Sequence, residues 1–162
     1  MTAALEAFSL SLDRLVSALA SCVHTPSPHQ QGGLQQFLAD TIERHLETTL
    51  TTSYSLSRAS DRYSPELNET ADLALANGSS ERRIFFEVEF RPNAEKDLVK
   101  FQIGANRGTL AAAVLILAID RNNINRSYYT MPEYRKFERI IEELQPNYPL
   151  LLLGVRIGND AA

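Results

Sequence analysis

The sequence predicts a single α/β domain, built as a mixed β-sheet with helices on both faces. Three observations predict it: apolar residues at helical spacing near the N-terminus, two strand-like segments joined by a turn sequence, and two unbroken apolar runs that alternate with helices. Such runs are typical of parallel strands buried on both faces. A length of 162 residues is usual for one domain.

Helical spacing marks two segments of the first 50 residues, Leu5–Val23 and Leu34–Leu50. A stretch with two prolines and a glycine pair separates them, and a helix does not continue through such a composition. We therefore expect residues 1–24 to form an N-terminal helix, 25–33 a loop, and 34–162 the core of the domain.

The middle of the chain predicts antiparallel strands. Residues 51–57, 71–76 and 84–90 have the alternation or the Thr, β-branched and aromatic content of strands. The last two flank Asn77-Gly78-Ser79-Ser80, which is a turn sequence. If the turn is centred between Ser79 and Ser80, paired residues have numbers that add up to 159.

Helices and apolar strands alternate in the second half. Residues 94–107 predict a helix, 109–120 a buried strand, and 150–157 a second apolar strand beside the first. The sequence Thr130-Met131-Pro132-Glu133 fits a capping box with proline in the first turn. A further helix should therefore begin there and end near Leu144.

Composition excludes several classes of protein. The net charge of −4 argues against binding polyanions through bulk charge, although the segment from Arg82 to Arg139 holds 11 basic against 7 acidic residues. A basic face around an acidic site and a solvated surface of mixed charge are both compatible with this pattern. Cys22 is the only cysteine, which excludes an internal disulfide. No apolar run reaches the roughly 20 residues of a membrane helix, so we expect a cytoplasmic protein.

Three carboxylates fall on one face of the predicted hairpin. The sum of 159 places Asp72 opposite Glu87, and the pleat puts Glu89 on the same face as Glu87. Clustered acids repel one another and need a compensating cation. A hard divalent ion such as Mg²⁺ prefers oxygen ligands, and beside a phosphodiester it would activate a bound water.

An Asp on one strand, Glu-x-Glu on the next and a helix reading Asp97-Leu98-Val99-Lys100-Phe101-Gln102 resemble the PD-(D/E)xK nuclease superfamily. The likeness is greatest to BglII-like type II restriction endonucleases and covers about Asp72 to Gly154. It implies a restriction-endonuclease-like fold in which residues 34–162 form the catalytic core of a Mg²⁺-dependent DNA endonuclease, with Mn²⁺ as a substitute.

The resemblance implies a role for each matching position. Asp72 and Glu87 would be metal ligands, and Glu89 stands where the family usually has lysine, so that it would help to hold the metal or act as a base. Lys100 is the candidate to supply the missing cation from the helix. Glu43 is a weaker candidate for an accessory ligand.

Double-stranded DNA and a second copy of the chain are the expected partners, because cutting both strands of a palindrome needs two sites related by twofold symmetry. The helix Leu5–Val23 could form the dimer interface. Basic and aromatic residues in and after the loop that leaves the first apolar strand could contact phosphates or base edges. They are Arg121, Arg126, Tyr128, Tyr129 and Arg135.

Plainer interpretations stay open beside these. The three acids could form a solvated strand face that is paired with nearby arginines, and Lys100 an ordinary surface residue. The main alternative function is a catalytically inactive relative that acts as a DNA-binding or assembly subunit. A nuclease that acts in repair or on RNA is a third reading.

Overall fold

The computed structural model describes Asp40 and residues 54–58, 61–77, 81–89, 93–120 and 129–157. The two predicted N-terminal helices lie outside these residues, apart from Asp40, which is helical. The described elements are, in chain order, β1 (Tyr54–Arg58), β2 (Leu73–Asn77), β3 (Arg83–Glu89), α3 (Glu95–Arg107), β4 (Leu110–Asp120), α4 (Met131–Leu144) and β5 (Leu150–Ile157).

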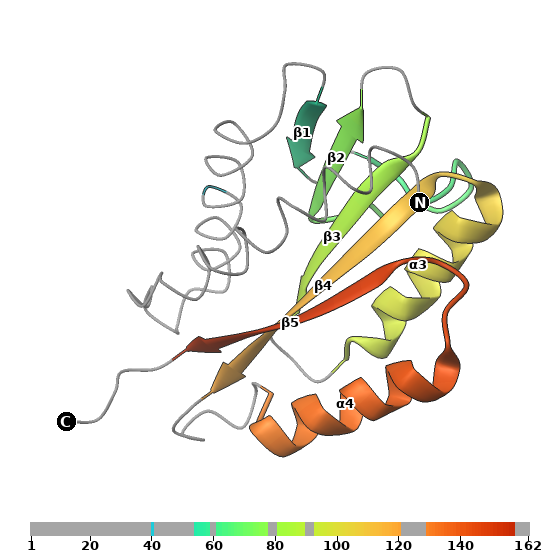
Figure 1. The fold of residues 1–162 in the computed structure, drawn as a ribbon. Coiled ribbons are helices and arrows are strands. Elements are labelled where there is room, and N and C mark those ends of the chain that lie inside the picture. The colour runs from blue at the N-terminus through green and yellow to red at the C-terminus, as the bar shows by residue number, and fades with distance from the viewer. Residues whose placement is uncertain are drawn as a thin grey trace.

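The five described strands form one mixed sheet in the order β1-β2-β3-β4-β5 (Figure 1). Strand β2 is antiparallel to both β1 and β3, whereas β4 runs parallel to both β3 and β5. Each parallel connection passes through a helix, α3 between β3 and β4 and α4 between β4 and β5. The predicted α/β architecture with a mixed sheet is confirmed.

The register of the hairpin agrees with the sequence. Leu73 pairs with Phe86 and Leu75 with Ile84, so the numbers of paired residues add up to 159, as the turn sequence predicts. Because side chains alternate between the two faces of a sheet, this register decides which acids share a face. The predicted placement of Asp72 beside Glu87 follows from it.

Local sequence explains where the two helices begin and end. Gly108 ends α3 in a left-handed conformation with φ of 75°, which glycine adopts at little cost. At the start of α4 the Thr130 side chain accepts a hydrogen bond from the Glu133 amide, and Glu133 accepts one from the Thr130 amide. The predicted capping box is thus confirmed.

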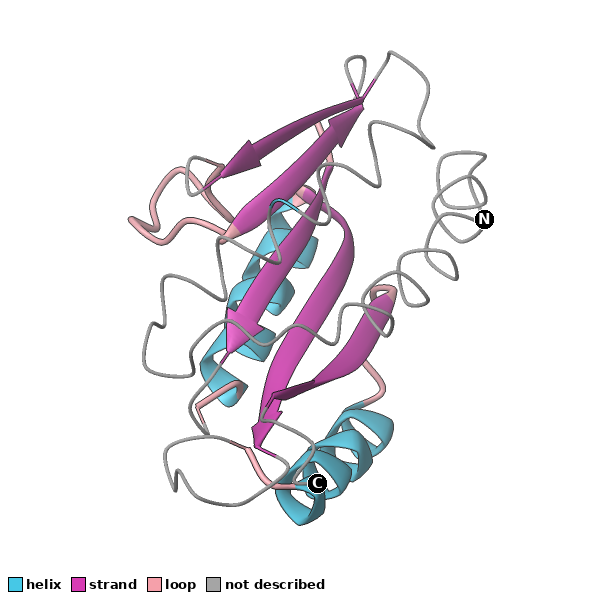
Figure 2. Cartoon of the chain, turned by 90° about the vertical axis from the view of Figure 1, so that its left-hand side faces the viewer, coloured by secondary structure: helices cyan, strands magenta, loops and turns pink. Residues whose placement is uncertain are grey.

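Both described helices cover the same face of the sheet (Figure 2). Phe101 of α3 and Phe137 of α4 pack in one core with Phe85 and Leu115, whose side chains point to that face. Phe86, on the opposite face, is also fully buried. Helices on both faces were expected, and within the described residues helices cover one face.

No helix in the described ranges is both long enough and apolar enough to cross a membrane.

Candidate active site

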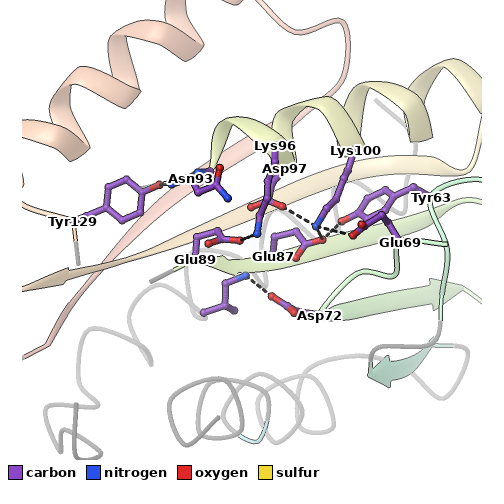
Figure 3. A network of polar contacts seen from close by, with 12 residues as sticks. Tyr63, Glu69, Asp72, Glu87, Glu89, Asn93, Lys96, Asp97, Lys100 and Tyr129 are labelled. Carbon is purple, nitrogen blue, oxygen red and sulfur yellow. Dashed lines mark hydrogen bonds and ion pairs between the residues drawn. The ribbon is translucent and has the colours of Figure 1, made fainter. Parts of the chain in front are cut away.

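Glu87 and Glu89 are the acids that β3 directs toward α3. They are two residues apart on the strand, so the pleat puts both side chains on the face that α3 covers. Figure 3 shows Lys96, Asp97 and Lys100 of α3 reaching down to them. Glu87 is buried with 3% of its surface exposed, which is rare for a carboxylate without a partner.

Asp72 lies beside the backbone of β3, immediately before β2. Its Oδ2 accepts a hydrogen bond of 2.8 Å from the amide of Val88. If the register of the hairpin continued, Ala71 and Val88 would exchange backbone hydrogen bonds. The Ala71 amide donates instead to the Asp61 carbonyl at 3.1 Å. The Asp72 carboxylate therefore takes the place of a strand carbonyl, which fixes it next to Glu87.

Lys100 joins the strand acids to the helix. Its Nζ lies 3.2 Å from Glu87 Oε1, 2.9 Å from Asp97 Oδ1 and 3.8 Å from Glu69 Oε2. The Lys100 side chain is only 14% exposed, so it is not an ordinary surface lysine. The structure thus answers whether Lys100 can reach the site, which the sequence alone left open.

Asp97 is an acidic residue of this cluster to which sequence reasoning gave no role. It is fully buried, and its carboxylate oxygens receive no well-directed hydrogen bond from the described part of the chain, although Lys100 Nζ lies close to Oδ1. A signal was present, because Asp97 follows Ala94 by three residues and precedes Phe101 by four. Those apolar residues belong to the buried stripe of α3, where an acid is unusual.

Tyr63 is a second residue of the site that sequence reasoning missed. Its hydroxyl donates a hydrogen bond of 2.6 Å to Glu87 Oε1, the oxygen that Lys100 also approaches. The ring is fully buried and contacts Phe85 and Phe101 at centroid distances of 4.5 and 5.9 Å. Tyr63 precedes β2 in irregular structure, so neither helical nor strand periodicity pointed to it.

Glu89 pairs with a different lysine from the one that contacts Glu87. Its Oε1 lies 2.7 Å from Nζ of Lys96, and the Glu89 side chain is 13% exposed. This hydrogen-bonded pair raises the pKa of Lys96. A lysine of the facing helix therefore neutralises Glu89.

Burial is the largest single influence on the pKa values of the groups in this cluster. It raises the pKa of Glu87 to about 8, and the charge of Asp72 adds to the rise while Tyr63 and Lys100 oppose it. Burial also raises the pKa of Asp97, against the opposing contact with Lys100. For Lys100, burial lowers the pKa, but the contacts with Asp97 and Glu87 outweigh burial and the net shift is upward.

The donor set fits a hard divalent cation held by few protein ligands. No group of three or more His, Cys, Asp or Glu side chains arranged to hold a metal is present in the ranges that the structure describes. Asp72 and Glu87 nonetheless supply two adjacent carboxylates, and Mg²⁺ is usually bound by one or two. Among the described residues, five carboxyl groups lie with two ammonium groups, which leaves a formal charge of −3 when every carboxyl is ionised. The carboxyl groups are Glu69, Asp72, Glu87, Glu89 and Asp97, and the ammonium groups are those of Lys96 and Lys100.

Tyr129 has a structural role that corrects its assignment as a nucleic-acid contact. It is 3% exposed, and its hydroxyl accepts hydrogen bonds from the amides of Asn93 and Ala94 at 3.0 and 2.9 Å. The side chain therefore ties the segment before α4 to the start of α3, and almost none of its surface is exposed for contact with a nucleic acid.

The other proposed DNA contacts divide into two groups. Arg135 is exposed on α4 and lines a surface hollow. The remaining candidates lie outside the described residues, as does the accessory acid, and these are Arg121, Arg126, Tyr128 and Glu43.

Comparison of the chain with protein-family models and with curated proteins finds no match.

The raised pKa of Glu87 predicts how the stability of the metal-free protein depends on pH. A carboxyl whose pKa rises from 4.5 to about 8 on folding binds more protons in the folded state, so the free energy of unfolding falls as pH rises between these values. Asp97 acts in the same direction. We expect urea unfolding from pH 5 to pH 8 to show a loss of up to about 1.4 kcal/mol per pH unit for each group.

Glu87→Gln is the control for this pH dependence. Gln does not titrate, so the variant should lose the part of the slope that Glu87 contributes and be more stable than the wild type at pH 8. Equal slopes for the two proteins would show that Glu87 titrates normally in the folded state.

Proposed function

We propose that this protein is a Mg²⁺-dependent DNA endonuclease of the type II restriction kind, belonging to the PD-(D/E)xK superfamily. The observation that carries the proposal is the 3.2 Å contact between Lys100 Nζ and Glu87 Oε1. The strand position that usually supplies lysine in that superfamily holds Glu89, and α3 instead brings the largely covered Lys100 to the Glu87 carboxylate. Asp, Glu and Lys thus meet at one site although the linear motif lacks its lysine.

Each side chain then has a part in phosphodiester hydrolysis. Asp72 and Glu87 would hold the ion, with Asp72 fixed by the Val88 amide and Glu87 by the Tyr63 hydroxyl. Bound Mg²⁺ supplies polarisation of a phosphoryl oxygen and a water of lowered pKa. The Lys100 ammonium would stabilise the negative charge that develops on the scissile phosphate.

Binding of the cation would also change the protonation of the site. A carboxyl with a pKa of about 8 carries a proton at neutral pH, and a metal ligand must give that proton up. Glu89 could orient the attacking water only after leaving Lys96, from which it is separated by 2.7 Å. We therefore give Glu89 a smaller part in the proposed mechanism than Asp72 or Glu87.

Digestion of plasmid DNA tests the proposed function. The wild-type protein should produce discrete fragments with Mg²⁺ or Mn²⁺ and none when EDTA replaces the metal. Discrete fragments would require recognition of a sequence, and double-strand cuts would favour a homodimer with two sites. A protein that shifts duplex DNA in a gel and leaves it intact at micromolar concentration would refute the nuclease.

A catalytically inactive DNA-binding or assembly subunit is the second candidate function. The observation that favours it is the Glu89–Lys96 ion pair, which neutralises one of the three acids that the sequence assigned to the metal. Calorimetric titration with Mn²⁺ separates the two functions. A decayed site should give no heat of binding, whereas a retained one should bind Mn²⁺ and lose this binding in Asp72→Asn.

A further inference from the structure

Helix α4 carries a basic face that the proposed active site does not use. Arg135, Lys136 and Arg139 are exposed and, with Met131 and Pro132, line a surface hollow of about 420 Å³. The three basic residues follow one another at helical spacing, on the side of α4 opposite Phe137, which is buried in the core. We call Arg135, Lys136 and Arg139 the basic face.

The charges of α4 are not arranged to stabilise the helix itself. Cations are favourable in the last turn of a helix, yet that turn contains no basic residue and the basic face begins in the N-terminal half. Across the ranges that the structure describes, none of the three side chains forms an ion pair. The exposed acids of α4, among them Glu138, Glu142 and Glu143, are not among the described residues that line the hollow, so the three cations that line it favour an external anion there.

The start of α4, which leads into the basic face, and the carboxylate site lie at the same edge of the sheet. Tyr129, just before α4, pairs with Ile119 near the end of β4, and its hydroxyl binds the amides of Asn93 and Ala94 before α3. The beginnings of both helices are therefore held together at the carboxyl ends of β3 and β4, as Figure 1 shows. Glu87 and Glu89 are among the last three residues of β3, at that edge.

The spacing of the basic face suits a repeating anion. Four residues of α-helix rise about 6 Å, which separates Arg135 from Arg139 along the axis. Two steps along one strand of duplex DNA cover about 7 Å of its axis. We propose that the basic face binds consecutive phosphates of duplex DNA beside the carboxylate site, an inference that rests on the proposed function and identifies how its substrate docks.

Salt-dependent binding tests this docking surface. The affinity of a fluorescent duplex is measured by anisotropy in EDTA, so that no cleavage occurs, over a range of KCl concentrations. In the triple variant Arg135→Gln, Lys136→Gln, Arg139→Gln, the slope of log affinity against log salt should be smaller by about 0.9 for each residue changed. Affinity at low salt should fall on the order of tenfold or more, by a similar factor for unrelated sequences.

Arg107→Gln is the matched control, because Arg107 is 56% exposed in the last turn of α3 and lies 3.7 Å from Glu66. It should change neither the slope nor the affinity. A triple variant with the wild-type slope would overturn the docking surface, whether or not the protein cuts DNA. A reduced slope in the triple variant, with no cleavage by the wild type, would support the docking surface and refute the nuclease.

Two further outcomes are informative. A wild-type protein that binds no duplex would overturn the proposal, and binding of phosphatidylserine vesicles by the wild type but not by the triple variant would then assign the basic face to a lipid surface. Loss of duplex binding in Glu87→Gln would show that DNA is held by the carboxylate site and not by the basic face.

Discussion

Replacing Glu87 with glutamine should reduce cleavage of DNA by on the order of a thousandfold or more, which corresponds to about 4 kcal/mol in the activation free energy. Gln keeps the shape of the side chain but removes the negative charge that would hold the metal. Binding of Mn²⁺ should be lost together with the cleavage. Fragment formation and calorimetric titration, measured on the same preparations, check the two effects.

The fold should tolerate Glu87→Gln. With a pKa of about 8, the metal-free carboxyl is already protonated at neutral pH and can be replaced by another uncharged group of the same size. Glu95→Gln is the control, since Glu95 is an exposed acid in the first turn of α3. It should cut DNA at the wild-type rate, and a Glu87→Gln protein that also did so would exclude Glu87 from the chemistry.

Replacing Lys100 with methionine should lower cleavage by about a hundredfold to a thousandfold, the usual loss when one preorganised group that stabilises a transition-state charge is removed. Its effect on metal binding should be opposite to that of Glu87→Gln. The ammonium of Lys100 lies 3.2 Å from Glu87 Oε1 and repels a cation bound there, so Lys100→Met should bind Mn²⁺ at least as tightly as the wild type.

Lys96→Met is the matched control, because Lys96 lies one turn earlier on α3 and pairs with Glu89. It should retain most of the cleavage activity. Lys100→Met leaves two buried carboxylates without their cation, so urea unfolding must show that the variant is folded under the assay conditions. If Lys96→Met lost the activity and Lys100→Met kept it, the lysine role would belong to the partner of Glu89.

Sequence reasoning predicted the scaffold of the site because that scaffold follows from local rules. The turn sequence Asn77-Gly78-Ser79-Ser80 predicted the register, the register placed Asp72 beside Glu87, and the capping box set the start of α4. These features depend on residues close together in the chain, whose pairing is fixed by the pleat and by the free amides of a helix end.

The rest of the site depends on contacts between distant segments. Tyr63 reaches Glu87 across 24 positions of the chain, from a stretch without regular structure, and no periodicity predicts such a path. The burial of Tyr129 arises in the same way, from amides 35 and 36 positions away. Asp97 was visible as an acid on an apolar stripe three residues before Lys100, but its proximity to Glu87 required the packing of α3 on the sheet.

Phe101 packs in the hydrophobic core directly beside the proposed active site. It follows Lys100 directly, is fully buried, and its ring lies 5.9 Å from that of Tyr63 and 6.3 Å from that of Tyr148. A smaller side chain at this position would let α3 and Tyr63 settle differently and would move both groups that touch Glu87 Oε1. The size and shape of the side chain at position 101 therefore set the geometry of the site as well as filling the core.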